Sequence, residues 1–298
     1  AKEPILPLHF FKNRNFVLIM SIALLFGAAF MGSILYLTQF NQQVFGASPT
    51  QSGLMLLPLV AGIMVSSIAS GQIISRTGRY KIFMQIGIVI ATISMVGLAM
   101  LTPDKPFLYE ALVMVPLGLG LGVLMPTMNL VVQSEFKQHE LGVATSSSQL
   151  FRSLGSTIGT AVFGAMLTAG IVASLGDTSK DAYLASLRQS PEASKVGSLD
   201  DVNTLLTLNT PDVKKQITEG AEKQFAQIQP AQAQDTVRTK FLDDQKTFSS
   251  TITHAFSDSL QKIFIASSLL LLVVTVLVFL IKEKPLAKAS PITTPGAE

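Results

Sequence analysis

The chain lacks cysteine altogether, and it has few charged residues for its length. Without cysteine there can be no disulfide framework and no thiolate metal site. The histidines His9, His139 and His254 are far apart in the sequence, so we expect no metal site. Only 14% of the 298 residues are charged, whereas a soluble domain carries about a quarter. This shortage of charge argues against an ordinary soluble protein.

Apolar residues make up 48% of the sequence, and they gather in long runs. Six runs are long enough to cross a hydrocarbon core about 30 Å thick. They cover residues 16–40, 51–74, 81–101, 108–132, 143–173 and 260–281. Inside a bilayer each run has to satisfy its own backbone hydrogen bonds, so each is expected to be a helix. The sequence therefore predicts an all-α integral membrane protein with six transmembrane helices.

Lysine and arginine are unevenly distributed among the short connections between these runs. Arg76, Arg79 and Lys81 follow the second run, and other basic residues precede the first run and follow the last. The connections at the opposite end, such as FGASPTQ, carry no net charge. Because cytoplasmic loops are enriched in lysine and arginine, both ends of the chain are predicted to be cytoplasmic. This topology accounts for the net charge of +3, so no nucleic-acid partner is expected.

The stretch GQIISRTGRYK, residues 71–81, combines turn glycines with arginines in the pattern G-x-x-x-S-R-x-G-R. Gly78 suits a turn that needs a positive φ, and Arg76 and Arg79 can bond helix-end carbonyls or lipid phosphates. The arginines are either simple membrane anchors or parts of a functional loop. From Gly71 to Arg79 the pattern resembles the loop motif of the major facilitator superfamily. Ser75 stands where the stronger copy of that motif has aspartate.

Three further stretches resemble one branch of this family, the 14-span drug:proton antiporters of the EmrB/QacA type. They are YLTQFNQQVFGASPTQSGLMLLP (36–58), VPLGLGLGVLMPTMN (115–129) and SSSQLFRSLGSTIGTAVFG (146–164). The resemblance covers residues 1–175 and, more loosely, the last run. It implies a six-helix half-bundle, the C-terminal half of a transporter whose N-terminal half belongs to the same polypeptide. It also implies multidrug efflux from a bacterial cytoplasmic (inner) membrane, with lipophilic small molecules exchanged for protons by alternating access.

Polar residues at helical spacing in the first, fourth and fifth runs mark a candidate substrate pathway. These residues are Tyr36, Gln39, Gln43, Asn129, Gln149 and Arg152. Polar groups are costly in lipid unless they find partners, so they either line a cavity or join helices by hydrogen bonds. The side chain of Arg152 either faces the cavity or reaches the cytoplasmic interface of the membrane with its charged end.

Carboxylates are absent from the middle of every run. Glu110, near the outer end of the fourth run, is the one local candidate for proton coupling. The resemblance implies that the main proton carboxylate lies in the N-terminal half. Pairs of small residues four positions apart predict close approach of helices. These pairs are Ser67 and Gly71, Gly118 and Gly122, and Gly155 and Gly159.

Residues 176–257 differ in composition, because they hold eleven of the nineteen acidic residues. We interpret residues 1–15 as a cytoplasmic linker, 16–175 as helices one to five, 176–257 as an extracytoplasmic loop, 258–282 as the last helix and 283–298 as a cytoplasmic tail. A helix start at Thr210 and Pro211 predicts helical stretches over 210–228 and 233–256. The loop is either a hairpin that caps the outer mouth or meets a periplasmic adaptor protein, or a solvated and partly disordered segment.

A second function class stays open: an autonomous six-span membrane sensor or scaffold protein that works through its outer loop. An enzyme is not expected, because the sequence has no cluster of histidine and carboxylate residues, no serine–histidine pairing and no metal-ligand spacing. Nothing in the sequence indicates a cofactor. An N-terminal neighbour with six to eight further spans would favour the transporter over the sensor.

Overall fold

The computed structural model describes residues 8–175, 181–188, 198–199, 201–226 and 231–283, and this part of the chain is helical and contains no strand. Most of the expected tail (283–298) and the first seven residues of the expected linker lie outside the described residues. A short 3-10 helix, η1 (Leu8–Lys12), precedes the first long helix.

Six helices are long and apolar enough to span a membrane, which confirms the predicted all-helical membrane fold. The spans are α1 (Arg14–Gln43), α2 (Pro49–Met55) with α3 (Leu57–Thr77), α4 (Lys81–Ala99), α5 (Phe107–Glu135), α6 (Leu141–Leu175) and the last part of α11 (Ala231–Leu280).

Capping residues set several of the helix ends. Asn13 accepts hydrogen bonds from the backbone N–H groups of Asn15 and Phe16, so α1 begins earlier than its apolar run. Ser48 and Gln51 form a capping box at the start of α2, with Pro49 in the first turn. Gly78 ends α3 in the left-handed conformation at φ 70°, as the turn signal predicts.

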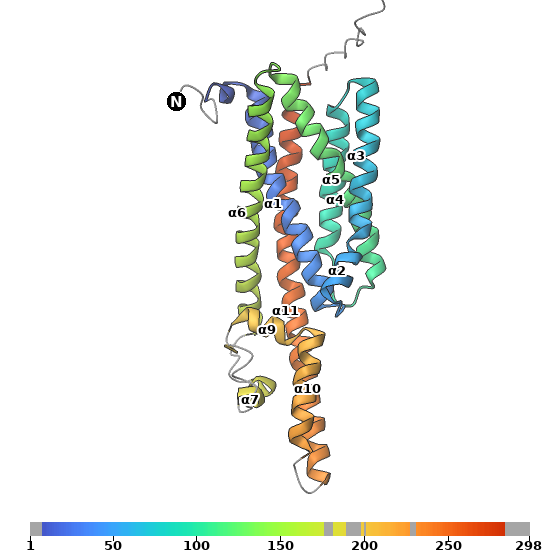
Figure 1. Ribbon diagram of the computed structural model, residues 1–298, viewed down its shortest axis with the longest axis vertical. Helices are drawn as coiled ribbons and strands as arrows, with labels where there is room; N and C mark the ends of the chain where they lie inside the picture. The colour runs from blue at the N-terminus through green and yellow to red at the C-terminus, as the bar shows by residue number, and fades with distance from the viewer. Residues whose placement is uncertain (1–7, 176–180, 189–197, 200, 227–230, 284–298) are drawn as a thin grey trace, which may run out of the picture.

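The bundle has two groups of helices, with α1 against α6 and α3 and α4 against α5 (Figure 1). Helix α11 lies against α4, α1 and α6. Small residues allow the α3–α5 contact: a Cβ on Gly118 would meet the backbone of Leu59 and Gly62, and one on Gly122 would meet Ile63 and Ser66. This confirms the predicted close packing at Gly118 and Gly122.

The pair Ser67 and Gly71 behaves differently from that expectation. Ser67 donates a hydrogen bond to the carbonyl oxygen of Gly122 at 2.6 Å, so it does take part in the α3–α5 contact. A Cβ on Gly71 would meet nothing within 4 Å among the described residues. The closest approach between these helices is therefore one turn earlier, at Gly62 and Ser66.

The beginning of α1 and the end of α11 lie at the same end of the bundle. Asn15 donates to the carbonyl oxygen of Lys282 at 2.9 Å and accepts from its backbone N–H at 3.2 Å. Helices α7 (Ala182–Arg188), α9 (Val202–Leu208) and α10 (Pro211–Phe225) lie at the other end (Figure 1). We refer to these as the terminal end and the loop end.

Helix α11 unites two stretches that the sequence analysis treats separately. The expected helical stretch 233–256 and the expected span 260–281 form one helix of 50 residues. The physical reason is the absence of any glycine or proline between Pro230 and Pro285, so nothing breaks the helix where it leaves the bundle. The last span therefore continues beyond the loop end as a rigid arm.

The loop helices have a hydrophobic core separate from that of the bundle. Tyr183 and Leu187 of α7, Ile217 of α10, and Phe248 and Ile252 of α11 are among its buried members. The ring of Tyr183 lies 5.2 Å from that of Phe248, centroid to centroid. This part of the segment 176–257 is thus a packed helical unit.

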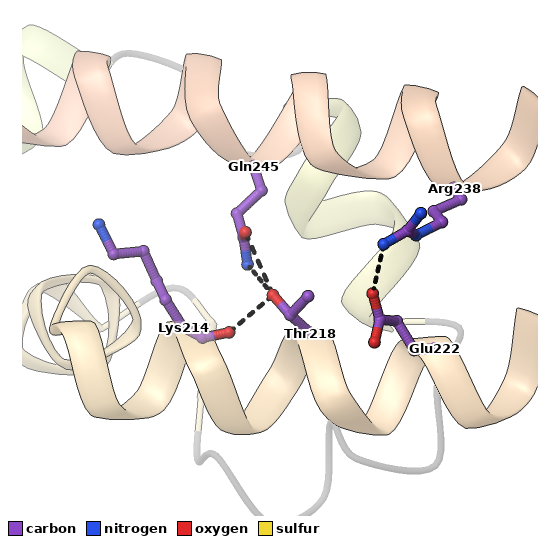
Figure 2. Close-up of polar contacts among 5 residues, drawn as sticks. All are labelled: Lys214, Thr218, Glu222, Arg238 and Gln245. Carbon is purple, nitrogen blue, oxygen red and sulfur yellow. Dashed lines mark hydrogen bonds and ion pairs between the residues drawn. The ribbon is translucent and has the colours of Figure 1, made fainter. Parts of the chain in front are cut away.

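Polar contacts also join α10 to α11 along the arm (Figure 2). Arg238 forms an ion pair with Glu222 at 2.9 Å, and the side chains of Thr218 and Gln245 are hydrogen-bonded at 3.3 Å. Lys214 donates to Ser249 at 2.9 Å, and its burial lowers the pKa of its ammonium group. The hairpin formed by α10 and the first part of α11 is therefore held together by both apolar and polar contacts.

Candidate functional site

Helices α1 and α6 form the groove in which most of the expected pathway residues lie. Glycines permit the close contact, because a Cβ on Gly155 would meet the carbonyl oxygen of Leu24 and one on Gly159 would meet Ala28. The predicted close packing at Gly155 and Gly159 is confirmed. Two cavities are lined by residues of both helices, one beside this contact and one nearer the loop end.

The first cavity, here called the Arg152 cavity, has a volume of ≈ 150 Å³. It is lined by Gly27, Phe30 and Met31 of α1, Met125 of α5, and Gln149, Arg152, Ser153 and Ser156 of α6. The guanidinium group of Arg152 donates a hydrogen bond to the side-chain oxygen of Gln149. None of the described residues that line it carries a carboxylate, so Arg152 is a cation among apolar and neutral polar groups.

The depth of Arg152 bears on the two alternatives for its role. Its carbonyl oxygen lies against Gly27, which is near the midpoint of the 30-residue helix α1. A helix of that length extends about 45 Å, so its midpoint is far from either headgroup region. This depth favours a cavity-facing arginine over one that reaches the cytoplasmic interface.

The second cavity, here called the Gln39 cavity, lies at the loop end of α1 and α6 and has a volume of ≈ 370 Å³. It is lined by Tyr36, Gln39, Gln42 and Gln43 of α1, Gly164, Leu167 and Thr168 of α6, Asn203, Leu206 and Thr207 of α9, and Thr210 and Phe256. Its polar groups are amides and hydroxyls. Loop and span residues therefore share one cavity.

An aromatic pair lies between the two cavities. Phe163 of α6 packs against Gly32 of α1, where a Cβ would be 2.5 Å from the phenyl ring. The ring of Phe163 also meets that of Tyr36 edge to face, with centroids 6.3 Å apart. Tyr36 is buried, and its hydroxyl lies 3.4 Å from the carbonyl oxygen of Thr160. These contacts hold α6 against α1 between Met31 and Tyr36.

The structure therefore divides the six expected pathway residues into three groups. Gln149 and Arg152 meet in the first cavity, while Tyr36, Gln39 and Gln43 meet in the second. Asn129 is exposed on α5, one turn beyond Met125, and lines neither cavity.

The loop motif lies at the terminal end, between α3 and α4. Arg76 and Arg79 are exposed, and their guanidinium groups form no ion pair or hydrogen bond with any residue that the structure describes. The start of α4 is bonded instead by Glu283, which accepts hydrogen bonds from the backbone N–H groups of Tyr80 at 3.1 Å and Lys81 at 3.3 Å.

A second polar cluster at the terminal end was not found by the sequence analysis. Glu135 at the end of α5 accepts hydrogen bonds from the side chains of Asn13 at 2.8 Å and Asn15 at 2.5 Å. With the contact between Asn15 and Lys282, this cluster joins α1, α5 and the end of α11. Its members are more than 100 residues apart in sequence, and no local pattern indicates that they meet.

Glu110 is fully buried in the first turns of α5, next to the equally buried Asn41 of α1. The two side chains interact with each other, but no hydrogen bond of ordinary length and angle joins them or links them to another described residue. An unpaired polar group in an apolar interior is costly, and such groups in membrane proteins are commonly functional. The structure thus places the sequence candidate for proton coupling, Glu110, in a buried and largely apolar environment.

Comparison with known proteins identifies the family. The sequence profile described as Major Facilitator Superfamily matches residues 1–160, more than half of the chain. Together with the six spans, this shows that the chain belongs to the Major Facilitator Superfamily, a family of membrane transporters and not of enzymes.

Three relatives illustrate the neighbourhood within that family. The chain is 34% identical over 250 residues to the Multidrug transporter protein MdtP of Bacillus subtilis, an alignment that covers 81% of this chain and 45% of that protein. It is 31% identical to the Tetracenomycin C resistance and export protein of Streptomyces glaucescens, over 57% of this chain and 32% of the relative. It is 28% identical to the Tetracycline resistance determinant of Streptomyces rimosus, over 59% of this chain and 50% of the relative. The chain spans half or less of the length of these relatives.

Proposed function

We propose that this chain is the C-terminal half of a multidrug efflux transporter of the 14-span EmrB/QacA type, which exports lipophilic compounds in exchange for protons. Its relatives are named for multidrug transport, tetracycline resistance and tetracenomycin C export, and this chain aligns with half or less of each. An N-terminal half of the same polypeptide would supply the other wall of the pathway. The bacterial inner membrane is the location that the bacterial transporter relatives suggest, and the distribution of lysine and arginine favours cytoplasmic positions for both ends of this chain.

The observation that carries this proposal is the Arg152 cavity. Binding sites for small lipophilic molecules combine apolar walls with a few polar groups that fix orientation. Phe30, Met31 and Met125 supply the apolar walls, and the flexible methionines adapt to ligands of different shape. Arg152 and Gln149 supply the hydrogen-bonding groups, which suit carbonyl, phenolic or carboxylate oxygens on a substrate.

Alternating access would change the close contact between α1 and α6. Along α1 the Arg152 cavity ends at Met31 and the Gln39 cavity begins at Tyr36, so a movement of α1 against α6 would be needed to pass a compound from one to the other. Glu110 is our candidate for a local proton site, since its buried carboxyl group has only the neutral amide of Asn41 beside it among the described residues. A periplasmic adaptor protein is a further partner that the loop helices could meet.

An efflux assay on the full-length protein tests this function. Cells that overproduce it should extrude a lipophilic dye, and a protonophore should abolish the extrusion. Arg152→Gln should reduce efflux about tenfold or more, because a hydrogen bond to a charged group contributes about 1.5–3 kcal/mol. Arg238→Gln is the matched control, since Arg238 is exposed on the arm and should leave efflux unchanged. Efflux that continues at the same rate in the presence of the protonophore would contradict proton coupling. Equal efflux in the Arg152→Gln and Arg238→Gln variants would contradict the role of Arg152.

One observation favours the alternative of a six-span sensor or scaffold: the loop helices have a core of their own, as an independent interaction module would. The mass of the native polypeptide distinguishes the two functions. A C-terminal epitope tag on the chromosomal copy should reveal a membrane protein near twice the 31.9 kDa of this chain. A band at 31.9 kDa would support the sensor or scaffold instead.

A further inference from the structure

The Gln39 cavity is unusual because one of its walls comes from the loop. Asn203, Leu206 and Thr207 of α9 face α1 and α6 across a space of ≈ 370 Å³. Along α1 this space lies nearer the loop end than the contact of Gly32 with Phe163.

Helix α9 is held in place by hydrogen bonds to the spans. The side chain of Gln43 donates to the carbonyl oxygen of Leu206 at 3.1 Å and accepts from the side-chain amide of Asn209 at 3.2 Å. Asn209 is 1% exposed, and it bonds Ser249 of α11 at 2.6 Å and Lys214 of α10 at 3.4 Å. The wall formed by α9 is therefore a fixed part of the cavity.

The chemistry of the cavity differs from that of the Arg152 cavity. Its described lining residues include three glutamines, an asparagine, three threonines and two aromatic residues, and none of them is charged. The side-chain oxygen of Gln39 is buried and has no hydrogen-bond partner among the described residues. A buried acceptor without a donor is costly, so this oxygen would gain from a ligand that brings a hydroxyl or N–H group.

We propose that the Gln39 cavity is a second ligand subsite, selective for uncharged aromatic compounds that donate a hydrogen bond to Gln39, with α9 of the loop as its outer wall. The inference rests on the proposed export function and deepens it. Tyr36 and Phe256 lie behind the cavity wall, 2% and 0% exposed, and give it an aromatic backing, while the amides and hydroxyls receive the polar groups of a ligand. The loop then takes part in choosing which compounds leave.

A pair of ligands tests the donor requirement directly. The probes are a fluorescent aromatic phenol and its methyl ether, which differ by one hydrogen-bond donor. Binding is measured on the purified full-length protein in detergent, separately from efflux in vesicles. The phenol should bind more tightly than the ether. Gln39→Leu should lower the affinity for the phenol about tenfold, as the loss of one buried hydrogen bond predicts. It should change the affinity for the ether by less than about twofold.

A matched pair of loop variants tests the wall. Thr207 lines the cavity, whereas Thr251 of α11 is not among its lining residues, and both hydroxyls bond the carbonyl oxygen four residues earlier, at 2.7 Å and 3.0 Å. Thr207→Phe should fill part of the cavity and weaken both probes, while Thr251→Phe should leave both unchanged. An equal effect of the two variants would overturn the role of α9.

The outcomes separate the subsite from the export function. Wild-type protein that binds the phenol and the ether equally, with no change in Gln39→Leu, would overturn the subsite even if efflux is intact. Absence of efflux for every compound would overturn the export function. Selective phenol binding that Gln39→Leu abolishes, in a protein whose circular dichroism matches the wild type, would support the subsite.

Discussion

The contact between α1 and α6 gives the sharpest test of the packing that forms the groove. Gly155 lies where α6 crosses α1, and a Cβ added there would collide with the carbonyl oxygen of Leu24. The obstacle is backbone, so no rotation of a side chain relieves it. Gly142 lies on the same helix, and a Cβ there would meet nothing within 4 Å among the described residues. Gly155→Ala and Gly142→Ala are therefore a matched pair.

The magnitude follows from two opposing terms. Replacing glycine by alanine in the middle of a helix stabilises it by about 0.5–1 kcal/mol. Gly155 lies in the middle of α6, whereas Gly142 is the second residue of that helix and receives only part of this gain. Only Gly155→Ala also overpacks a helix contact, which costs about 1–3 kcal/mol, so it should be less stable than Gly142→Ala by up to about 3 kcal/mol. A melting temperature shifts by about 2–4 °C per kcal/mol in a chain of 150–250 residues and by less in a longer one, so the two melting temperatures should differ by a few degrees.

The assay is thermal unfolding of the full-length protein in detergent, followed by circular dichroism. We expect Gly142→Ala to melt at or slightly above the wild-type temperature and Gly155→Ala to melt below it. If both variants melt together, α1 and α6 do not approach as closely as the structure shows. The packing of α6 against α1 between the two cavities would then lose its basis.

Three further predictions concern single positions. Gly78→Ala should destabilise the end of α3 by about 1–2 kcal/mol, because φ 70° is unfavourable for alanine, and Gly78→Asn should cost less in the same melting assay. Phe248→Ala should cost about 3–5 kcal/mol and remove hydrogen-exchange protection from the loop helices, while the spans keep theirs, because the two cores are separate. Burial raises the pKa of Tyr183 above its ordinary value of 10.0, because the neutral phenol is favoured in the folded state. The buried phenol therefore contributes its full share to the free energy of unfolding below pH 10, and this share is lost as the pH rises through the higher folded-state pKa. Tyr183→Phe should therefore make loop protection less sensitive to alkali; an unchanged alkaline loss would contradict this.

The spans were predictable because lipid leaves the backbone few choices. A run of apolar residues that crosses a bilayer has to form a helix, and each of the six runs lies within one of the observed spans or extends past its end by a few residues. The structure lengthens the first run to Arg14–Gln43 because Asn13 caps the helix and polar residues continue it at the far end. The union of 233–256 with the last span follows from the same logic, since no glycine or proline separates them.

The candidate site was predictable only within each helix. Helical spacing correctly places Gln149 and Arg152 on one face of α6, and Tyr36, Gln39 and Gln43 on one face of α1. Spacing does not tell which helices meet, or at what depth. The division of these residues between two cavities therefore depends on the α1–α6 contact, which is a property of the fold.

The part that α9 plays in the Gln39 cavity leaves almost no trace in the sequence. Gln43 bonds the backbone carbonyl oxygen of Leu206, a group that every residue offers, so the identity of residue 206 carries no sign of the contact. From the sequence alone, nothing distinguishes Asn209 from other asparagines at helix ends, and in the structure it is the C-cap of α9. Only its burial and its bonds to Gln43, Ser249 and Lys214 show that it joins the loop to the spans. Sequence patterns report the periodicity of one element, whereas this site is made by four helices, α1, α6, α9 and α11, and α9 meets α1 through a backbone carbonyl group and the side-chain amides of Gln43 and Asn209.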